Sequence, residues 1–190
     1  YPKPIKLLVE SHYIRAAKGG VGEAKAAGNY AAALYPSKLA REQGYDQVLW
    51  LDAVHHKYAQ EVGTMNIFFV FKDEIVTPAT SGTILKGITR ASTIEILRGN
   101  GLNVSEREIS IDEIYSKYQA GELLEVFGTG TAALIANVEE IKYEDHIMHL
   151  DSSNWQLSTS IKNEINGMRF GTIEDKRGWT VPVKEVAVTA

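Results

Sequence analysis

The sequence predicts a single domain of mixed α and β structure, and three observations lead to that prediction. The chain has 190 residues, which suits one large domain or at most two small ones. Apolar residues make up 44% of the chain, enough for a substantial core. Strand-like and helix-like segments alternate irregularly, and no internal repeat, linker or low-complexity segment separates them. One α/β or α+β domain is therefore the most economical arrangement.

Short apolar runs predict the strands. Residues 46–54 form such a run, DQVLWLDAV, and are expected to be a buried strand. Residues 66–78 predict two strands joined by a tight turn at Lys72 and Asp73. Further strands are expected over residues 103–110, 123–130 and 132–143.

Helical periodicity and end signals predict four helices. They are expected over residues 30–44, 89–101, 110–122 and 153–171. Gly44 is the expected stop of the first, and Ser110 is the expected N-cap of the third. Residues 183–190 are expected to be a loose end.

Charge and composition exclude several classes of protein. The net charge is −4 and the basic residues do not cluster, so nucleic acid is not expected as the main partner. No apolar run is long enough to span a bilayer. The chain lacks cysteine, which excludes disulfides, thiolate nucleophiles and cysteine-type zinc sites and fits an intracellular, cytoplasmic protein. The chain begins at Tyr1 rather than at a methionine, so the lack of a secretory signal carries little weight.

Residues 19–30, GGVGEAKAAGNY, place a glycine-rich stretch before Lys25, as a phosphate-binding loop would. The Walker pattern requires glycine directly before the lysine and Ser or Thr directly after it, whereas Ala24 and Ala26 flank Lys25. Residues 128–133, GTGTAA, fit the Rossmann fingerprint only on paper, because a strand pattern and not a helix follows. The G-x-S-x-G elbow of serine hydrolases is absent.

The histidines do not predict a metal site. His146 and His149 are three positions apart, with Asp145 and Asp151 beside them. They would share a face in a helix and diverge in a strand, and the segment has no clear helical period. The sequence contains no H-E-x-x-H motif. We therefore expect surface or turn histidines.

Lys25 is a candidate for Schiff-base chemistry. Its small neighbours would let a flat cofactor approach the backbone, and Tyr30 is near enough to point into the same pocket. A pyridoxal phosphate site also needs a carboxylate, for which Glu61 is a candidate, and backbone N–H groups for the phosphate, as at residues 87–89 or 128–131. A solvated lysine, a core tyrosine, a surface acid and a helix cap explain the same residues, and spacing alone leaves both interpretations open.

Five segments occur in an order that carries a family resemblance: GGVGEAKAAGNYAAAL, DQVLWLDAV, EVGTMNIFFVF, LKGITR and FGTGTAA. Together they resemble the branched-chain amino acid aminotransferases, which are fold type IV pyridoxal phosphate enzymes. The resemblance runs from Lys6 to Val183. It implies the large domain seen in D-amino acid aminotransferase-like proteins, in which a mixed sheet curls into a pseudo-barrel flanked by helices.

The resemblance also implies roles for individual residues. Lys25 matches the catalytic lysine that holds pyridoxal phosphate as a Schiff base and later acts as the general base. Tyr30 matches the tyrosine on the cofactor's phenolic oxygen, and Glu61 matches the glutamate on its pyridine nitrogen. Ala27 departs from the family, which commonly has glycine there. The remaining implied contacts are with the cofactor phosphate, from Ile88, Thr89 and Thr131, and with the substrate, from Thr64, Thr131, Ala132 and Ala133.

The implied activity is transamination of Leu, Ile and Val with 2-oxoglutarate by an intact, homodimeric protein. By the resemblance, residues 1–190 correspond to the C-terminal cofactor-binding domain alone, without the N-terminal small domain. That domain brings an arginine to the cofactor phosphate, so this chain is expected to be inactive by itself. Two alternatives remain. One is a D-amino acid aminotransferase or aminodeoxychorismate lyase of the same fold, and the other is a non-catalytic fragment or assembly domain.

Overall fold

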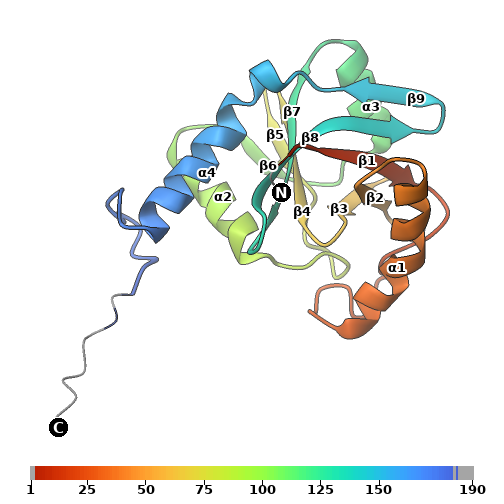
Figure 1. The fold of residues 1–190 in the computed structure, drawn as a ribbon, viewed down its shortest axis with the longest axis horizontal. Coiled ribbons are helices and arrows are strands. Elements are labelled where there is room, and N and C mark those ends of the chain that lie inside the picture. The colour runs from red at the N-terminus through yellow and green to blue at the C-terminus, as the bar shows by residue number, and fades with distance from the viewer. Residues whose placement is uncertain (1–2, 182, 184–190) are drawn as a thin grey trace, which may run out of the picture.

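The computed structural model describes residues 3–181 and residue 183, so the loose end expected over 183–190 lies, apart from Val183, outside the described residues. The described strands form one nine-stranded mixed sheet in the order β3-β2-β1-β8-β7-β4-β5-β6, with β9 paired to β8 (Figure 1). Their bounds are β1 Ile5–Glu10, β2 Gln47–Leu51, β3 Ala59–Val62, β4 Asn66–Phe71, β5 Ile75–Thr77, β6 Val104–Glu106, β7 Leu123–Gly130, β8 Leu134–Tyr143 and β9 His146–His149.

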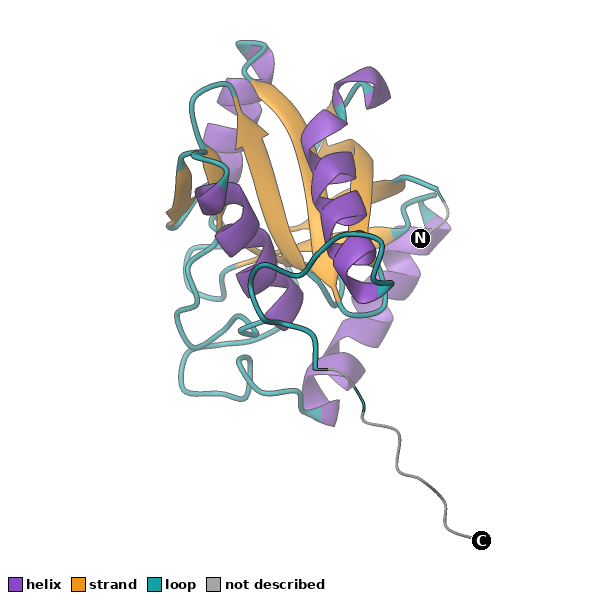
Figure 2. Ribbon diagram, turned by 90° about the vertical axis from the view of Figure 1, so that its left-hand side faces the viewer, coloured by secondary structure: helices purple, strands orange, loops and turns teal. Residues whose placement is uncertain are grey.

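Helices cover the sheet from more than one side (Figure 2). They are α1 (Ala27–Glu42), α2 (Ile88–Gly99), α3 (Ile111–Gln119) and α4 (Gln156–Arg169), with a short 3-10 turn over Ser152–Asn154. α2 and α4 contact each other and pack on β7 and β8, whereas α1 packs on β2 and α3 on β7 (Figure 1). No helix among the described residues is long and apolar enough to cross a membrane.

The core divides according to the two faces of the curled sheet. Along β4, Ile67 and Phe69 face one apolar cluster, to which β1, β2, β3, β7, β8 and α3 contribute. The next residue in the alternation, Phe68, faces a second cluster formed with α2 and α4, where it stacks on Phe127 with ring centroids 5.1 Å apart. Both faces of β4 are thus buried, which explains why its sequence is a continuous apolar run.

The predicted elements agree with the structure at most positions. The helix predicted over residues 30–44 begins earlier, at Ala27, and Gly44 lies just beyond its end with φ of 86°. The strand predicted over 103–110 is shorter and spans Val104–Glu106. Ser110, its predicted last residue, caps α3 as expected, by accepting a hydrogen bond from Glu113 N at 3.0 Å. The sequence prediction missed β9 and also β1, although Ile5, Leu7 and Val9 alternate with less buried residues along β1.

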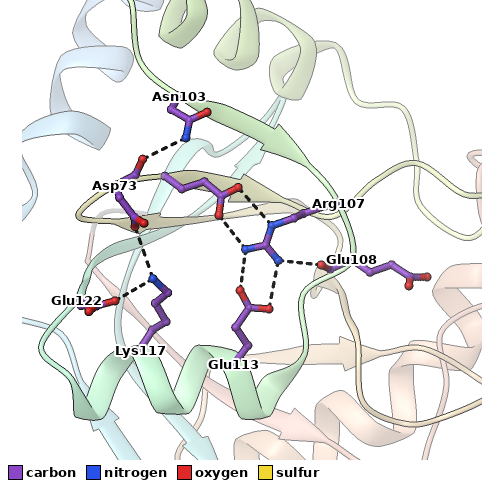
Figure 3. Close-up of polar contacts among 8 residues, drawn as sticks. Asp73, Asn103, Arg107, Glu108, Glu113, Lys117 and Glu122 are labelled. Atoms are coloured by element: carbon purple, nitrogen blue, oxygen red, sulfur yellow. Dashed lines mark hydrogen bonds and ion pairs between the residues drawn. The ribbon is translucent and has the colours of Figure 1, made fainter.

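A network of ion pairs ties the β4–β5 turn to α3 and to the chain that precedes it (Figure 3). Arg107 Nη2 lies 2.8 Å from Glu74 Oε2 and 2.6 Å from Glu113 Oε1. The hydrogen bond from Arg107 holds the pKa of Glu74 below its ordinary value, against the raising effect of burial. Lys117 joins Glu122 and Asp73 in the same way. These carboxylates are neutralised within the fold, and the network is structural.

Candidate active site

One cleft collects side chains from four distant segments of the chain. The loop before α1, the β3–β4 turn, the start of α2 and the β7–β8 turn line three adjoining hollows. Lys25, Tyr30 and Thr64 line all three hollows. The structure thus brings together every site residue predicted from the sequence: Lys25, Tyr30, Glu61, Thr64, Ile88, Thr89, Thr131, Ala132 and Ala133.

Asn29 fixes the loop that carries Lys25. The Asn29 side chain is buried, and its Nδ2 donates to the carbonyls of Val21 at 2.8 Å and Ala24 at 2.9 Å. Gly22 lets the loop lie directly on the chain opposite, because an added Cβ would stand 2.7 Å from the carbonyl oxygen of Thr83. Lys25 itself is exposed at the mouth of the cleft. The backbone of the loop is therefore fixed by these contacts, while the amine of Lys25 is accessible to a ligand in the cleft.

An Asn29→Ala variant is expected to lose about 1–3 kcal/mol of unfolding free energy, because two carbonyls would lose their buried donor. Amide hydrogen exchange over residues 20–26 should also become faster. Asn103→Ala is the matched control, since the Asn103 amide donates one exposed hydrogen bond, to the carbonyl of Asp73 at 3.1 Å. Equal stability losses in the two variants would show that Asn29 does not hold the loop.

Glu61 is the buried carboxylate of the cleft. Its Oε2 lies 3.1 Å from Arg15 Nε, and both side chains are almost fully buried, with exposures of 4% and 8%. Its Oε1 accepts a hydrogen bond from Leu85 N at 2.8 Å. Burial raises the pKa of Glu61 to about 7, although Arg15 and the Leu85 N–H act in the opposite direction. A cationic group placed beside this carboxylate would therefore favour its ionised form.

The start of α2 offers backbone donors to the cleft. Its N-cap is Gly87, and no side chain caps the helix, so N–H groups of the first turn are available to a ligand. Gly87 is packed tightly, because an added Cβ would collide with Oδ1 of Asn66. The Asn66 amide in turn donates to the carbonyl of Leu85 at 2.8 Å, which fixes the approach to the helix. Lys86, whose Nζ pairs with Glu23 at 3.6 Å, adds a positive charge at the same rim.

Two turns also line the cleft. Thr64 lies in the β3–β4 turn, which β2 anchors through a hydrogen bond from Trp50 Nε1 to the carbonyl of Gly63 at 3.0 Å. Residues 131–133 form the tight turn between β7 and β8, which pair as antiparallel strands up to Gly130 and Leu134. This hairpin explains why residues 128–133 do not open a helix. The small side chains of Ala132 and Ala133 line one hollow of the cleft.

Sequence reasoning missed several residues of the cleft. Arg15 carries no local signal, because its partner Glu61 lies far along the chain. Asn29 stands in the Gly-Asn-Tyr triplet of residues 28–30, but its bonds to the preceding loop were not foreseen. Asn66 and Lys86 also line the cleft and had no predicted role, and for Thr129 only backbone donors were predicted, as part of residues 128–131.

The histidines do not gather. His146 and His149 lie in β9, exposed, and contact different residues: Nδ1 of His146 lies 3.2 Å from the Tyr115 hydroxyl, and Nδ1 of His149 lies 3.3 Å from Glu140 Oε2. The described part of the chain contains no group of three or more His, Asp or Glu side chains that could hold a metal ion.

Comparisons with known proteins agree on one family. Residues 2–141 match the model of the family described as amino-transferase class IV. A probable branched-chain-amino-acid aminotransferase of Staphylococcus aureus is 50% identical over 182 residues, which are 95% of this chain and 51% of that protein. Branched-chain-amino-acid transaminase 1 of Bacillus subtilis matches with the same identity and coverage. The chain thus spans about half the length of the curated relatives it matches.

Solved structures give the same result. The branched-chain amino acid aminotransferase of Escherichia coli superposes with a TM-score of 0.77 at 30% identity, covering 92% of this chain and 54% of that one. The enzyme of Thermobaculum terrenum in its PLP form superposes with a TM-score of 0.71 at 27% identity, covering 89% and 53%. These similarities confirm the predicted fold, a curled mixed sheet flanked by helices.

Proposed function

Because the chain belongs to the class IV aminotransferase family, we propose that it is the cofactor-binding part of a branched-chain amino acid aminotransferase. Two observations support this assignment. Several relatives with that name are about half identical to the chain over almost its whole length. The chain also spans only half of each, so we propose that residues 1–190 correspond to their C-terminal large domain and that a small N-terminal domain completes the cleft.

The residues of the cleft fit pyridoxal phosphate. The uncapped first turn of α2 suits a phosphate group, Glu61 is a buried carboxylate suited to a ring nitrogen, and Lys25 supplies the amine. When bound, the cofactor withdraws electrons from the substrate's Cα, provided that its ring nitrogen stays protonated. Among the observations made on the structure, the convergence of Lys25, Glu61 and the α2 start on one cleft carries the proposal.

The proposed roles are those that the family resemblance implies, and the convergence of these residues on one cleft supports them. Lys25 would hold the cofactor covalently and, once displaced by the amino acid, would take the proton from the substrate's Cα and deliver it to the cofactor carbon. Glu61 keeps the ring nitrogen protonated, and Tyr30 donates to the phenolic oxygen. The remaining residues bind and orient: Ile88, Thr89 and Thr131 hold the phosphate, and Thr64, Thr131, Ala132 and Ala133 surround the substrate carboxylate.

We propose Leu, Ile and Val as amino donors and 2-oxoglutarate as the acceptor, in a cytoplasmic homodimer. The apolar outer face of α1 supports an assembly, because Leu34 and Tyr35 are 68% and 56% exposed there. The chain alone is not expected to turn over substrate, since positioning groups supply about 7–11 kcal/mol of barrier reduction and part of them would lie in the other half. For the whole protein, activity on D-alanine without activity on L-leucine would contradict the proposed substrates.

The proposal predicts where pyridoxal phosphate attaches to the chain. Mixing the two should give a visible absorbance band, and borohydride should fix the label on the peptide that contains Lys25. A Lys25→Ala variant should lose the band. Lys86→Ala is the matched control, because Lys86 lines the same cleft, and it should keep the band. A label on Lys86 or on another lysine, or no label at saturating cofactor, would overturn the assignment.

A further inference from the structure

Thr129, in β7, has a buried hydroxyl without a partner. The residue is 1% exposed, and its Oγ1 has no hydrogen bond to any described residue. Thr129 nevertheless lines the hollow that also contains Gly87, Ile88, Thr89 and Thr131. The sequence predicts only backbone donors over residues 128–131 and gives the Thr129 side chain no role.

The surroundings of Thr129 do not explain its hydroxyl. Thr129 pairs with Asn66 of β4, and the neighbouring register pair two positions away is Phe127 with Phe68, which belongs to the apolar cluster. Valine has the same shape as threonine and suits a strand equally well. A buried hydroxyl without a hydrogen bond destabilises the fold. The presence of threonine rather than valine at this position is therefore explained if a ligand accepts a hydrogen bond from the hydroxyl.

Hydrogen-bond donors surround this part of the hollow. The first turn of α2 lacks a side-chain cap, and the hydroxyls of Thr89 and Thr131 line the same space. Lys86, whose Nζ also pairs with Glu23, lines the same hollow. The nearest amide on β4, that of Asn66, is already committed to the carbonyl of Leu85 and to Glu61. A set of donors at the positive end of a helix suits an anion with several oxygens.

We propose that Thr129 is a further anion-binding residue of this cleft, whose hydroxyl donates a hydrogen bond to the phosphate group of the cofactor. The inference rests on the proposed function, because it takes the anion to be the cofactor's phosphate. Thr129 differs from Thr131 in its burial: Thr129 is 1% exposed and Thr131 is exposed, so a hydrogen bond from Thr129 forms in a lower-dielectric environment, where it is stronger.

The test compares Thr129→Val with the wild-type chain in two measurements. Without ligand, the variant should be as resistant to urea as the wild type, or more so, because an unpaired buried hydroxyl has been removed. Its affinity for pyridoxal phosphate should fall by roughly tenfold or more, as expected for the loss of a hydrogen bond to a charged group. Affinity for pyridoxal, which lacks the phosphate, should not change, and Thr129→Ser should restore the affinity for pyridoxal phosphate.

Thr93→Val is the matched control. Thr93 lies in α2, is fully buried and also has a hydroxyl without a partner among the described residues, but it is not among the residues that line the cleft. The control should leave both affinities unchanged.

Three results would overturn the role of Thr129. They are an unchanged affinity of Thr129→Val for pyridoxal phosphate, an equal fall in its affinity for pyridoxal, and a wild-type chain whose melting temperature neither inorganic phosphate nor pyridoxal phosphate raises. The borohydride labelling experiment tests the proposed function independently of Thr129. If Lys25 is labelled and Thr129→Val binds pyridoxal phosphate as tightly as the wild type, only the role of Thr129 is wrong. If phosphate binding depends on Thr129 but Lys25 is not labelled, only the proposed function is wrong.

Discussion

An Arg15→Met variant should lose about 3–5 kcal/mol of unfolding free energy, one of the two largest effects that the structure predicts. Arg15 lies 3.1 Å from Glu61, and both side chains are almost fully buried, so its removal leaves a buried carboxylate without its counter-charge. Arg15 Nη2 also donates to the carbonyls of Gly22 and Thr83, which would lose their donor. Urea denaturation at pH 8, where Glu61 is mostly ionised, measures the loss.

The double variant Arg15→Met/Glu61→Gln should recover part of that stability. It removes the buried charge, and the glutamine Oε1 can still accept the hydrogen bond from Leu85 N. Lys38→Met is the control for simple charge removal, because the Lys38–Glu42 pair is mostly exposed and worth at most about 0.5 kcal/mol. A loss in Arg15→Met no larger than that in Lys38→Met would show that the buried pair is not needed for the fold.

The second large effect is a fall in stability with rising pH that originates from Glu61. Its pKa is about 7 in the folded chain and 4.5 as an ordinary glutamate, so between these values the folded state binds more protons than the unfolded state. Stability from this group therefore falls as pH rises from 4.5 to 7, and the loss is complete above 7. From pH 5 to pH 8 the expected loss is about 2–3 kcal/mol.

Urea denaturation of the wild type and of Glu61→Gln at several pH values isolates this contribution. As pH rises, the unfolding free energy of the wild type should fall relative to that of Glu61→Gln, because glutamine does not titrate. Saturating pyridoxal phosphate should remove the pH dependence if a protonated ring nitrogen faces Glu61, because a cation beside the carboxylate lowers its pKa. Parallel curves for the two ligand-free proteins from pH 5 to 8 would contradict the raised pKa of Glu61.

Most elements of the fold could be predicted from the sequence, because their signals are local. The alternating and continuous apolar runs of β2, β4 and β7 and the periodicity of the helices need no knowledge of tertiary structure. β1 was missed because what makes it a central strand is its pairing with β2 and β8, and β8 lies more than a hundred positions away. The true start of α1 also depends on tertiary contacts, since Asn29 in its first turn binds the loop before it.

The candidate site also has a part that could be predicted from the sequence and a part that could not. The residues themselves made Lys25, Tyr30 and Glu61 candidates, together with residues 87–89 and 128–131, and the family resemblance gave them roles and added Thr64, Ala132 and Ala133. The class IV family match confirms that resemblance. The resemblance could not reveal the supporting contacts, because these join residues that only the folded sheet brings together. The Arg15–Glu61 pair and the unpaired hydroxyl of Thr129 are both of this kind. The roles of the predicted residues stay predictions until the labelling and affinity experiments are done.

The central place of β1 also constrains how the chain can be made. β1 pairs in parallel with residues 47–50 on one side and with residues 138–142 on the other. During synthesis from the N-terminus, β1 leaves the ribosome on the order of ten seconds before its second partner exists. Ile5, Leu7 and Val9, which the finished core buries, then remain without their β8 neighbours. Until then the early half of the chain exposes apolar surface that can aggregate, and the sheet closes only when β8 arrives.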